Sequence, residues 1–161
     1  GHRVVIVKQP LGIAFLAVGA LESARARFPD VTSWVVGGHS LGGTVAAIEA
    51  DASDDAADAP ARGLLLYASY PAGDLRGSLT ATVLSISGSN DGLATPADIE
   101  ASRADLPVSA RFEVIEGAVH SYFGDYGPQR GDGIPGITHD RARAEIGQLT
   151  LPFVTSVARA G

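Results

Sequence analysis

Short apolar runs alternate with helix-like segments along most of the chain. The runs are rich in aliphatic residues, as buried parallel strands are, and they predict strands at residues 4–7, 33–36, 64–67, 82–86 and 111–115. Apolar residues at helical spacing predict helices at residues 13–28, 43–50, 96–105 and 139–157. This alternation is typical of an α/β domain with a mostly parallel sheet and helices on both faces.

Turn and cap residues mark the ends of the predicted helices. Pro29 and Asp30 end the first helix. Thr95 is the expected N-cap of the third, with Pro96 at its first helical position. Pro152 is a candidate break in the last helix.

Composition and charge narrow the classes of function. The chain has 161 residues, 45% of them apolar, which is enough for one domain with a core, so we expect residues 1–161 to form a single domain. The net charge of -6 argues against nucleic acid or an anionic membrane surface as the main partner. No apolar run approaches the roughly 18 residues of a membrane span. The chain contains no cysteine, which excludes disulfides and thiolate nucleophiles.

The most distinctive motif is GHSLG at residues 38–42, which fits the pattern G-x-S-x-G. It lies between a predicted strand and a predicted helix, where this pattern forms a sharp turn that exposes a nucleophilic serine, here Ser40. Small neighbours are needed because the backbone of such a turn is strained. At the helix N-terminus, the backbone N–H of Leu41 is expected to stabilise negative charge on the reacting oxygen.

A serine nucleophile needs a base, and the chain has four histidines. His2 precedes a predicted strand, His39 is a variable position of the serine motif, and His139 begins a helix. His120 follows the last predicted strand, at the edge of the sheet where ligands collect in α/β proteins. We therefore predict His120 as the base.

The acid that orients the base is predicted from its position in the same way. Asp91 follows the fourth predicted strand, in a turn between glycines. Asp98 is a rival inside a predicted helix, and Asp74 follows the third strand only after a further loop. We favour Asp91, and the order Ser40, Asp91, His120 is the chain order of α/β-hydrolases.

The chain resembles the α/β-hydrolase fold, and within it the small, capless alpha/beta hydrolase family 5 related to dienelactone hydrolases. The matching stretches span nearly the whole chain and include VVIVKQPLGIAF, WVVGGHSLGG, LLLYASYPA, SGSNDGLATP and GAVHSYFGDYGPQRGDG. The resemblance implies Ser40 as nucleophile, His120 as base and Asp91 as acid, and acyl transfer to water, most often on esters. Dienelactone hydrolases proper use a cysteine nucleophile, whereas this chain has a serine.

The beginning of the chain departs from the family pattern. Family members begin with further strands and a helix, and one of those strands ends in a glycine-containing loop that supplies the second oxyanion N–H. Nothing here matches that loop, and the chain contains no methionine. We therefore expect an N-terminally incomplete fold, the C-terminal portion of the full one. The gap beside strand 33–36 would be filled by preceding residues, by a second chain, or by residues 4–7 shifted across to pair with it.

The substrate pocket is expected at the ends of the same strands. Five residues there either form apolar pocket walls or only pack their loops: Leu11, Tyr70, Pro71, Tyr122 and Phe123. The loop at 121–138 holds five glycines and two prolines and is longer than ordinary connections. Its Asp125 and Asp132 have no EF-hand spacing, and we predict no metal or cofactor.

Together with what the resemblance implies, these residues predict a serine hydrolase that cleaves small carboxylic esters through an acyl-enzyme. Two alternatives stay open. One is a thioesterase or peptidase that uses the same triad, because leaving-group pockets depend on shape rather than on motif. The other is a hydrolase scaffold that lacks half of its oxyanion hole and is catalytically impaired, or serves as a binding module.

Overall fold

The computed structural model describes residues 3–7, 14–53 and 60–159. Four strands form one sheet in the order β1-β2-β3-β4, and each neighbouring pair is parallel. The strands are β1 (Trp34–His39), β2 (Ala61–Tyr67), β3 (Thr82–Gly88) and β4 (Arg111–Ile115). The predicted fold class, α/β with a parallel sheet, is confirmed.

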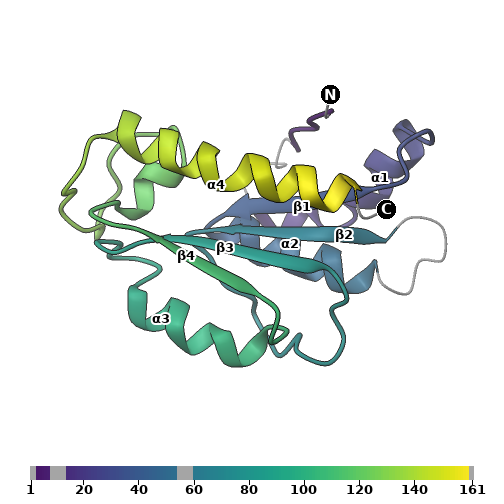
Figure 1. Ribbon diagram of the computed structural model, residues 1–161, viewed down its shortest axis with the longest axis horizontal. Helices are drawn as coiled ribbons and strands as arrows, with labels where there is room; N and C mark the ends of the chain where they lie inside the picture. The colour runs from purple at the N-terminus through teal and green to yellow at the C-terminus, as the bar shows by residue number, and fades with distance from the viewer. Residues whose placement is uncertain (1–2, 8–13, 54–59, 160–161) are drawn as a thin grey trace.

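Helices cover both faces of this sheet (Figure 1). The long α4 (His139–Arg159) lies along one face, and α2 (Leu41–Ala52) and α3 (Pro96–Ala101) lie on the other. The remaining helices are α1 (Ala20–Arg27) and the short 3-10 helices η2 (Ala14–Ala17), η3 (Ser102–Asp105) and η4 (His120–Phe123). Thr95 caps α3 with Pro96 at its first position, as predicted.

Alternate residues of the strands point to opposite faces, and so they build two apolar clusters. In β2, Leu64 and Leu66 pack with Ala47 of α2 in one cluster. Leu65 between them packs with Phe153 of α4 in the other. Because both faces of this strand are covered, its sequence from Leu64 to Tyr67 is continuously apolar rather than alternating.

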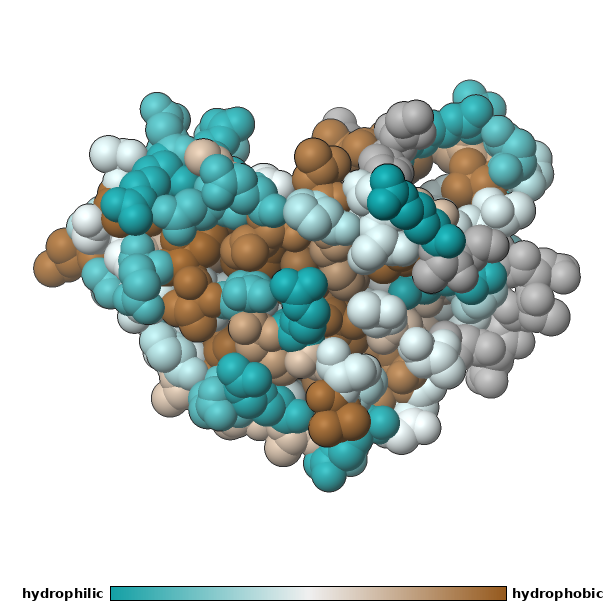
Figure 2. Space-filling view, in the orientation of Figure 1, coloured by the Kyte–Doolittle hydropathy of each residue, from teal (hydrophilic) through white to brown (hydrophobic). Residues whose placement is uncertain are grey.

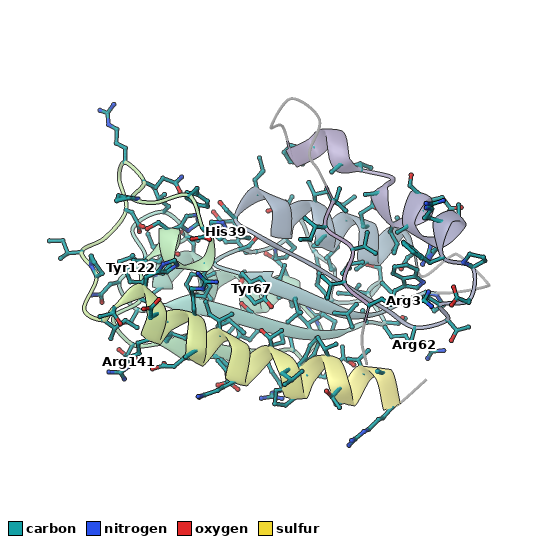
Figure 3. The ribbon with its side chains drawn as sticks, turned by 90° about the horizontal axis from the view of Figure 1, so that it is seen from above. Arg3, His39, Arg62, Tyr67, Tyr122 and Arg141 are labelled. Carbon is teal, nitrogen blue, oxygen red and sulfur yellow. The ribbon has the colours of Figure 1, made fainter. Side chains whose placement is uncertain are left out.

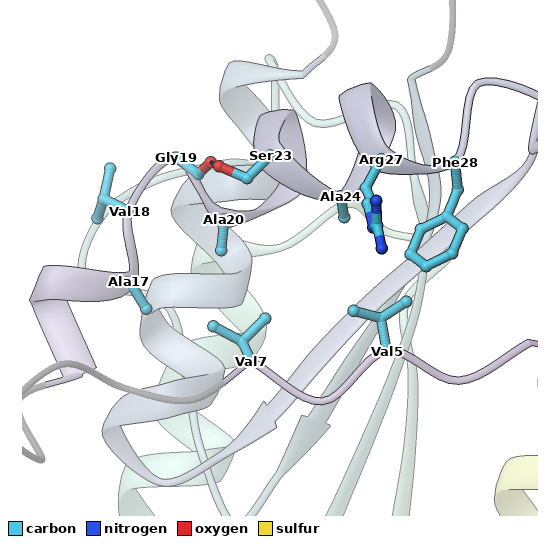
Figure 4. Close-up of a pocket in the computed structure, with 10 residues that line it drawn as sticks. All are labelled: Val5, Val7, Ala17, Val18, Gly19, Ala20, Ser23, Ala24, Arg27 and Phe28. Atoms are coloured by element: carbon cyan, nitrogen blue, oxygen red, sulfur yellow. Dashed lines mark hydrogen bonds between the residues drawn. The ribbon is translucent and has the colours of Figure 1, made fainter.

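The segment 3–7 is not a strand, so the strand predicted at 4–7 is wrong. Val5 and Val7 face α1 across a small hollow (Figure 4), whereas Ile6 between them is 89% exposed. A strand forms only through hydrogen bonds to a neighbouring strand, and an apolar run in the sequence does not show that such a strand is present. Among the described residues β1 pairs with β2 alone, so one of the three alternatives for the gap, a shift of residues 4–7 onto this strand, is ruled out.

Three predicted helices differ from the structure at internal breaks. The helix expected over 96–105 is divided into α3 and η3. The helix expected over 13–28 is divided into η2 and α1. The Glu49 carboxylate accepts hydrogen bonds from the backbone N–H groups of Gly19 and Leu21 and so caps a new helix there. In contrast, α4 runs unbroken through Pro152, whose exposed ring lies on the solvent side of the helix, so the break expected there is wrong.

Apolar side chains also reach the surface of the molecule. Figure 2 shows them gathered over β4 beneath α4, where Val114 is 52% exposed. None of the helices in the described part of the chain is both long and apolar enough to cross a membrane.

Candidate active site

β1 ends in a tight turn that places Ser40 at the N-terminus of α2. Ser40 has a φ of 53° and a ψ of -129° and is one of two non-glycine residues with positive φ in the described part of the chain. Such a backbone costs about 1–3 kcal/mol and persists where the surroundings enforce it. Gly38 is needed because a Cβ there would lie 2.4 Å from the backbone of Gly42. The chain therefore forms the strand-turn-helix that its G-x-S-x-G motif predicts.

Hydrogen bonds to the end of β2 hold this turn in place. The backbone N–H of Ser40 donates to the carbonyl of Tyr67 at 3.0 Å. The carbonyl of Ser40 accepts from the backbone N–H of Gly43 at 2.9 Å and from the hydroxyl of buried Ser69 at 2.6 Å. These bonds fix the backbone. No hydrogen bond to Ser40 Oγ occurs among the described residues.

His120 and Asp91 form a buried pair beyond the ends of β4 and β3. His120 Nδ1 lies 2.9 Å from Asp91 Oδ2, and the two side chains are 2% and 0% exposed. Asp91 Oδ1 accepts from the backbone N–H groups of Leu93 and Ala94, each at 2.8 Å. Because a carboxylate oxygen can only accept, Nδ1 carries the ring hydrogen and Nε2 is left as the acceptor.

The rival acids do not reach His120. Asp98 closes a capping box at the start of α3, where its Oδ2 accepts from the backbone N–H of Thr95 at 3.0 Å and from the Thr95 hydroxyl at 2.6 Å. Asp74 accepts from the backbone N–H of Arg76 at 2.9 Å. Of the three candidates, only Asp91 contacts the His120 ring.

His39 connects the serine turn with this pair. Its ring centroid lies 4.5 Å from that of His120, and the Tyr126 hydroxyl lies 3.1 Å from His39 Nδ1. Burial, together with repulsion from the charge of His120, lowers the pKa of His39 to about 4. Since His39 immediately precedes Ser40, the contact places the serine turn beside the His120–Asp91 pair.

A groove of about 1400 Å³ opens beside Ser40. Near the serine its walls include Leu41, Tyr126 and Gln129, and from there it continues along the outer edge of β1 to residues 3–7. The groove can accommodate a small acyl or alkyl group next to the serine hydroxyl.

Four of the five residues predicted as pocket walls are described, and they lie outside the groove. Leu11 is outside the described residues. Tyr122 and Phe123 pack against the apolar cluster under α4, Tyr70 is 38% exposed and Pro71 is buried, and none of these four lines the groove. Figure 3 shows Tyr122 and His39 at the same end of the sheet. A role for these residues in substrate binding stays a prediction.

Three residues that support the site are not predicted by the sequence. His39 is a variable position of the motif, Tyr126 belongs to no motif, and Asp132 suggests at most a cation ligand. In the structure, the Asp132 carboxylate accepts from the backbone N–H of His120. The one signal in the sequence was the length of the glycine-rich loop that carries Tyr126 and Asp132. No group of three or more residues able to hold a metal ion occurs in the described part of the chain.

Comparison with known proteins relates this architecture to other chains. A model of the Alpha/beta hydrolase family matches residues 1–144. A candidate alpha/beta hydrolase of unknown function from Agrobacterium tumefaciens is similar in structure, with a TM-score of 0.65 and 17% identity over 97% of this chain and 66% of that chain. A carboxylesterase from Nitrososphaera gargenis has a TM-score of 0.63 and 10% identity over 92% of this chain and 74% of that one. A candidate dienelactone hydrolase from Klebsiella pneumoniae has a TM-score of 0.58 and 14% identity over 84% and 60%.

These comparisons define how far the relationship extends. No curated protein matches the sequence significantly. The chain spans 66% of the length of the Agrobacterium protein, and at such identities the solved structures establish the fold alone. The family model covers most of the chain, including the serine turn and the residues of the buried pair, and confirms the resemblance drawn from the sequence. The chain therefore belongs to the alpha/beta hydrolase family.

Proposed function

We propose that Ser40, His120 and Asp91 act as nucleophile, base and acid in a serine hydrolase that cleaves small carboxylic esters. The observation that carries this proposal is the buried 2.9 Å contact between His120 and Asp91, which lies beside a strained serine at a helix N-terminus. Membership of the alpha/beta hydrolase family and the similarity to a carboxylesterase support hydrolysis as the reaction.

In the first half of the reaction, Ser40 Oγ attacks the ester carbonyl carbon while His120 Nε2 takes the hydroxyl proton. Asp91 keeps the ring oriented and stabilises the imidazolium that forms. The carbonyl oxygen becomes an oxyanion and accepts a hydrogen bond from the backbone N–H of Leu41, which begins α2 and has no acceptor within the helix. The C–O bond to the alcohol then breaks, the alcohol leaves with the proton from His120, and the acyl group stays on Ser40.

Water completes the cycle. His120 takes a proton from a water molecule as the water oxygen adds to the acyl carbon. The bond to Ser40 Oγ then breaks, the carboxylic acid leaves, and His120 returns its proton to the serine. No redox group or metal takes part in this scheme.

We further propose that a strand from outside the described residues pairs with the open edge of β1. The strand would come from a segment that precedes this one in the protein or from a second chain. The support is the groove itself, because parallel strands are normally covered on both faces and both edges.

A fluorophosphonate probe tests the nucleophile, and p-nitrophenyl esters of increasing acyl length test the substrate class. We expect one adduct, on Ser40, and faster hydrolysis of short acyl esters than of long ones. Ser40→Ala should abolish both labelling and hydrolysis. Ser109→Ala, a change at an exposed serine far along the chain from the turn, is the matched control and should alter neither.

The same experiment separates the alternatives. Labelling of Ser40 without ester hydrolysis, but with cleavage of thioesters or peptides, would assign the triad to a thioesterase or peptidase. Absence of labelling in a folded protein would overturn the catalytic proposal and leave the scaffold as a binding module.

A further inference from the structure

The loop between η4 and α4 returns to the ends of β3 and β4 and places the carboxylate of Asp132 among backbone N–H groups. Asp132 Oδ1 accepts from the N–H of His120 at 2.9 Å, of Gly133 at 2.8 Å and of Gly92 at 3.4 Å. Asp132 Oδ2 accepts from the N–H of Ser121 at 2.8 Å. One carboxylate thus gathers donors from three separate segments.

Two of those segments carry the buried pair, and the third is the loop of Asp132 itself. Gly92 directly follows Asp91 in the turn after β3, and His120 itself supplies a donor from the loop after β4. The two loops are 29 residues apart in sequence. Asp132 bonds to the backbone of both, so its position affects the distance between the Asp91 and His120 side chains.

The loop that carries Asp132 is seated closely on the Asp91 turn. A Cβ on Gly133 would lie 1.7 Å from the carbonyl oxygen of Asn90, so only glycine allows this approach. The Asn90 side chain donates from Nδ2 to the carbonyl of Ile134 at 2.9 Å. The loop is therefore held directly after Asp132, which limits the freedom of the carboxylate to move.

The negative charge of Asp132 is stabilised by these N–H donors rather than by a cationic side chain. None of the ion pairs among the described residues includes it. Burial acts to raise the pKa of Asp132, but hydrogen bonds from Ser121, His120 and Gly133 outweigh burial and lower it. The carboxylate therefore stays ionised across the neutral range, and charge-assisted hydrogen bonds of this kind are among the stronger ones.

We propose that Asp132 is a positioning residue that holds the turn of Asp91 and the loop of His120 in register, so that their side chains meet at hydrogen-bond distance. The proposal rests on the proposed function only for its effect on rate. Its effect on the Asp91–His120 hydrogen bond is independent of substrate. Displacement of a catalytic group by about 1 Å can lower the reaction rate on the order of a hundredfold.

The test compares Asp132→Asn and Asp132→Glu with Asp125→Asn, the same change at an exposed aspartate of the same loop. The asparagine amide would point N–H groups at backbone donors, and glutamate keeps the charge but moves it by one methylene. We expect both Asp132 variants to lower kcat at least about tenfold with little change in KM. The Asp125 variant should match the wild type.

A second readout needs no substrate. The Nδ1 proton of His120 should give a far-downfield proton NMR signal in the wild type, because it bonds to a carboxylate. This signal should broaden or disappear in both Asp132 variants and persist in Asp125→Asn. If Asp132→Asn does not fold, Asn90→Ala, which removes the bond to Ile134, should weaken the same signal to a lesser degree.

The outcomes separate the two proposals. A folded Asp132→Asn protein with wild-type kcat and an intact downfield signal overturns the positioning role. If Asp132→Glu keeps both wild-type kcat and the downfield signal, the positioning role is also overturned, since negative charge alone would then suffice. If the wild-type protein hydrolyses no ester, but Asp132→Asn still removes the downfield signal of His120, the positioning role is supported and the proposed function fails.

Discussion

Two histidine rings lie 4.5 Å apart beside Ser40, and at that distance two positive charges would repel strongly. The arrangement avoids this because the two rings have different partners. His120 bonds to the Asp91 carboxylate, which stabilises a proton on it during turnover. His39 faces the Tyr126 hydroxyl, and its pKa of about 4 keeps it neutral at neutral pH. His39 is therefore an uncharged neighbour that packs against the proposed base.

Exchange of Asp91 for asparagine tests the assignment of the acid. Asp91→Asn should lower kcat by up to about 10⁴-fold, because the amide no longer selects the ring tautomer that leaves Nε2 free. Asp98→Asn is the control and should leave kcat unchanged. It should instead lower the free energy of unfolding by about 1 kcal/mol through damage to the cap of α3. Steady-state kinetics and thermal unfolding measure both, and the reverse pattern would assign the acid role to Asp98.

The lowered pKa of His39 predicts a loss of stability in acid. Between pH of about 6.5 and 4, the unfolded chain binds a proton at His39 that the folded protein does not, so the free energy of unfolding falls as pH falls through this window. The half-buried ring keeps some contact with water, and we expect a contribution of about 1–2 kcal/mol.

His39→Gln should remove this contribution. Thermal unfolding at pH 7.5 and 4.5 would show a smaller difference between the two pH values for the variant than for the wild type. The comparison at pH 7.5 isolates the effect of lost packing, because His39 is neutral there. Equal pH dependence of the two proteins would contradict the account of His39 given above.

At the scale of elements, β1 has two tasks. Its carboxyl end forms the serine turn, and one of its edges is the only one in the described sheet that faces the groove. A shift of this strand would move Ser40 relative to His120, which is anchored beyond β4. A strand paired with the open edge of β1 should therefore stabilise the position of Ser40 as well as the sheet.

Hydrogen exchange tests whether a further strand covers β1. If it does, the amides of β1 that do not donate to β2 should exchange as slowly as those of β3. Intact mass and oligomeric state, measured on the same sample, would identify a preceding segment or a second chain as the source. Rapid exchange of these amides in a monomer with the mass of this chain alone would refute the proposed strand.

At the scale of the whole molecule, the parts of the fold that could be predicted are those with a regular, local pattern in the sequence. β2 and β3 are recognisable because buried parallel strands are mainly apolar, and β4 because apolar residues alternate with Arg111 and Glu113. The serine turn is recognisable because its glycines are a steric requirement. Residues 4–7 have the composition of a strand but pair with no strand in the described part of the chain, and a local sequence pattern does not show whether a pairing strand is present. Pro152 does not break α4, because it lies on the exposed side of the helix, and that position depends on tertiary packing.

The residues that hold the candidate site in place were harder to predict, for a different reason. The donors to Asp132 are backbone N–H groups, which every residue except proline has, so the residues that supply them have no signature in the sequence. Tyr126 and His39 meet across 87 residues. Chain order and strand ends indicated Asp91 and His120, but they could not reveal which groups hold that pair in place.

The position of α4 in the sequence has a consequence for how the molecule is made. Its Phe153 and Val157 close the apolar cluster that includes Leu65, Leu84 and Ile86 of the central strands. A ribosome adds about 5–20 residues per second, so the strands are complete on the order of seconds before this helix has been synthesised. During that interval the strands can bury only the face toward α2. The α4 face is thus the surface that a chaperone would encounter on the growing chain.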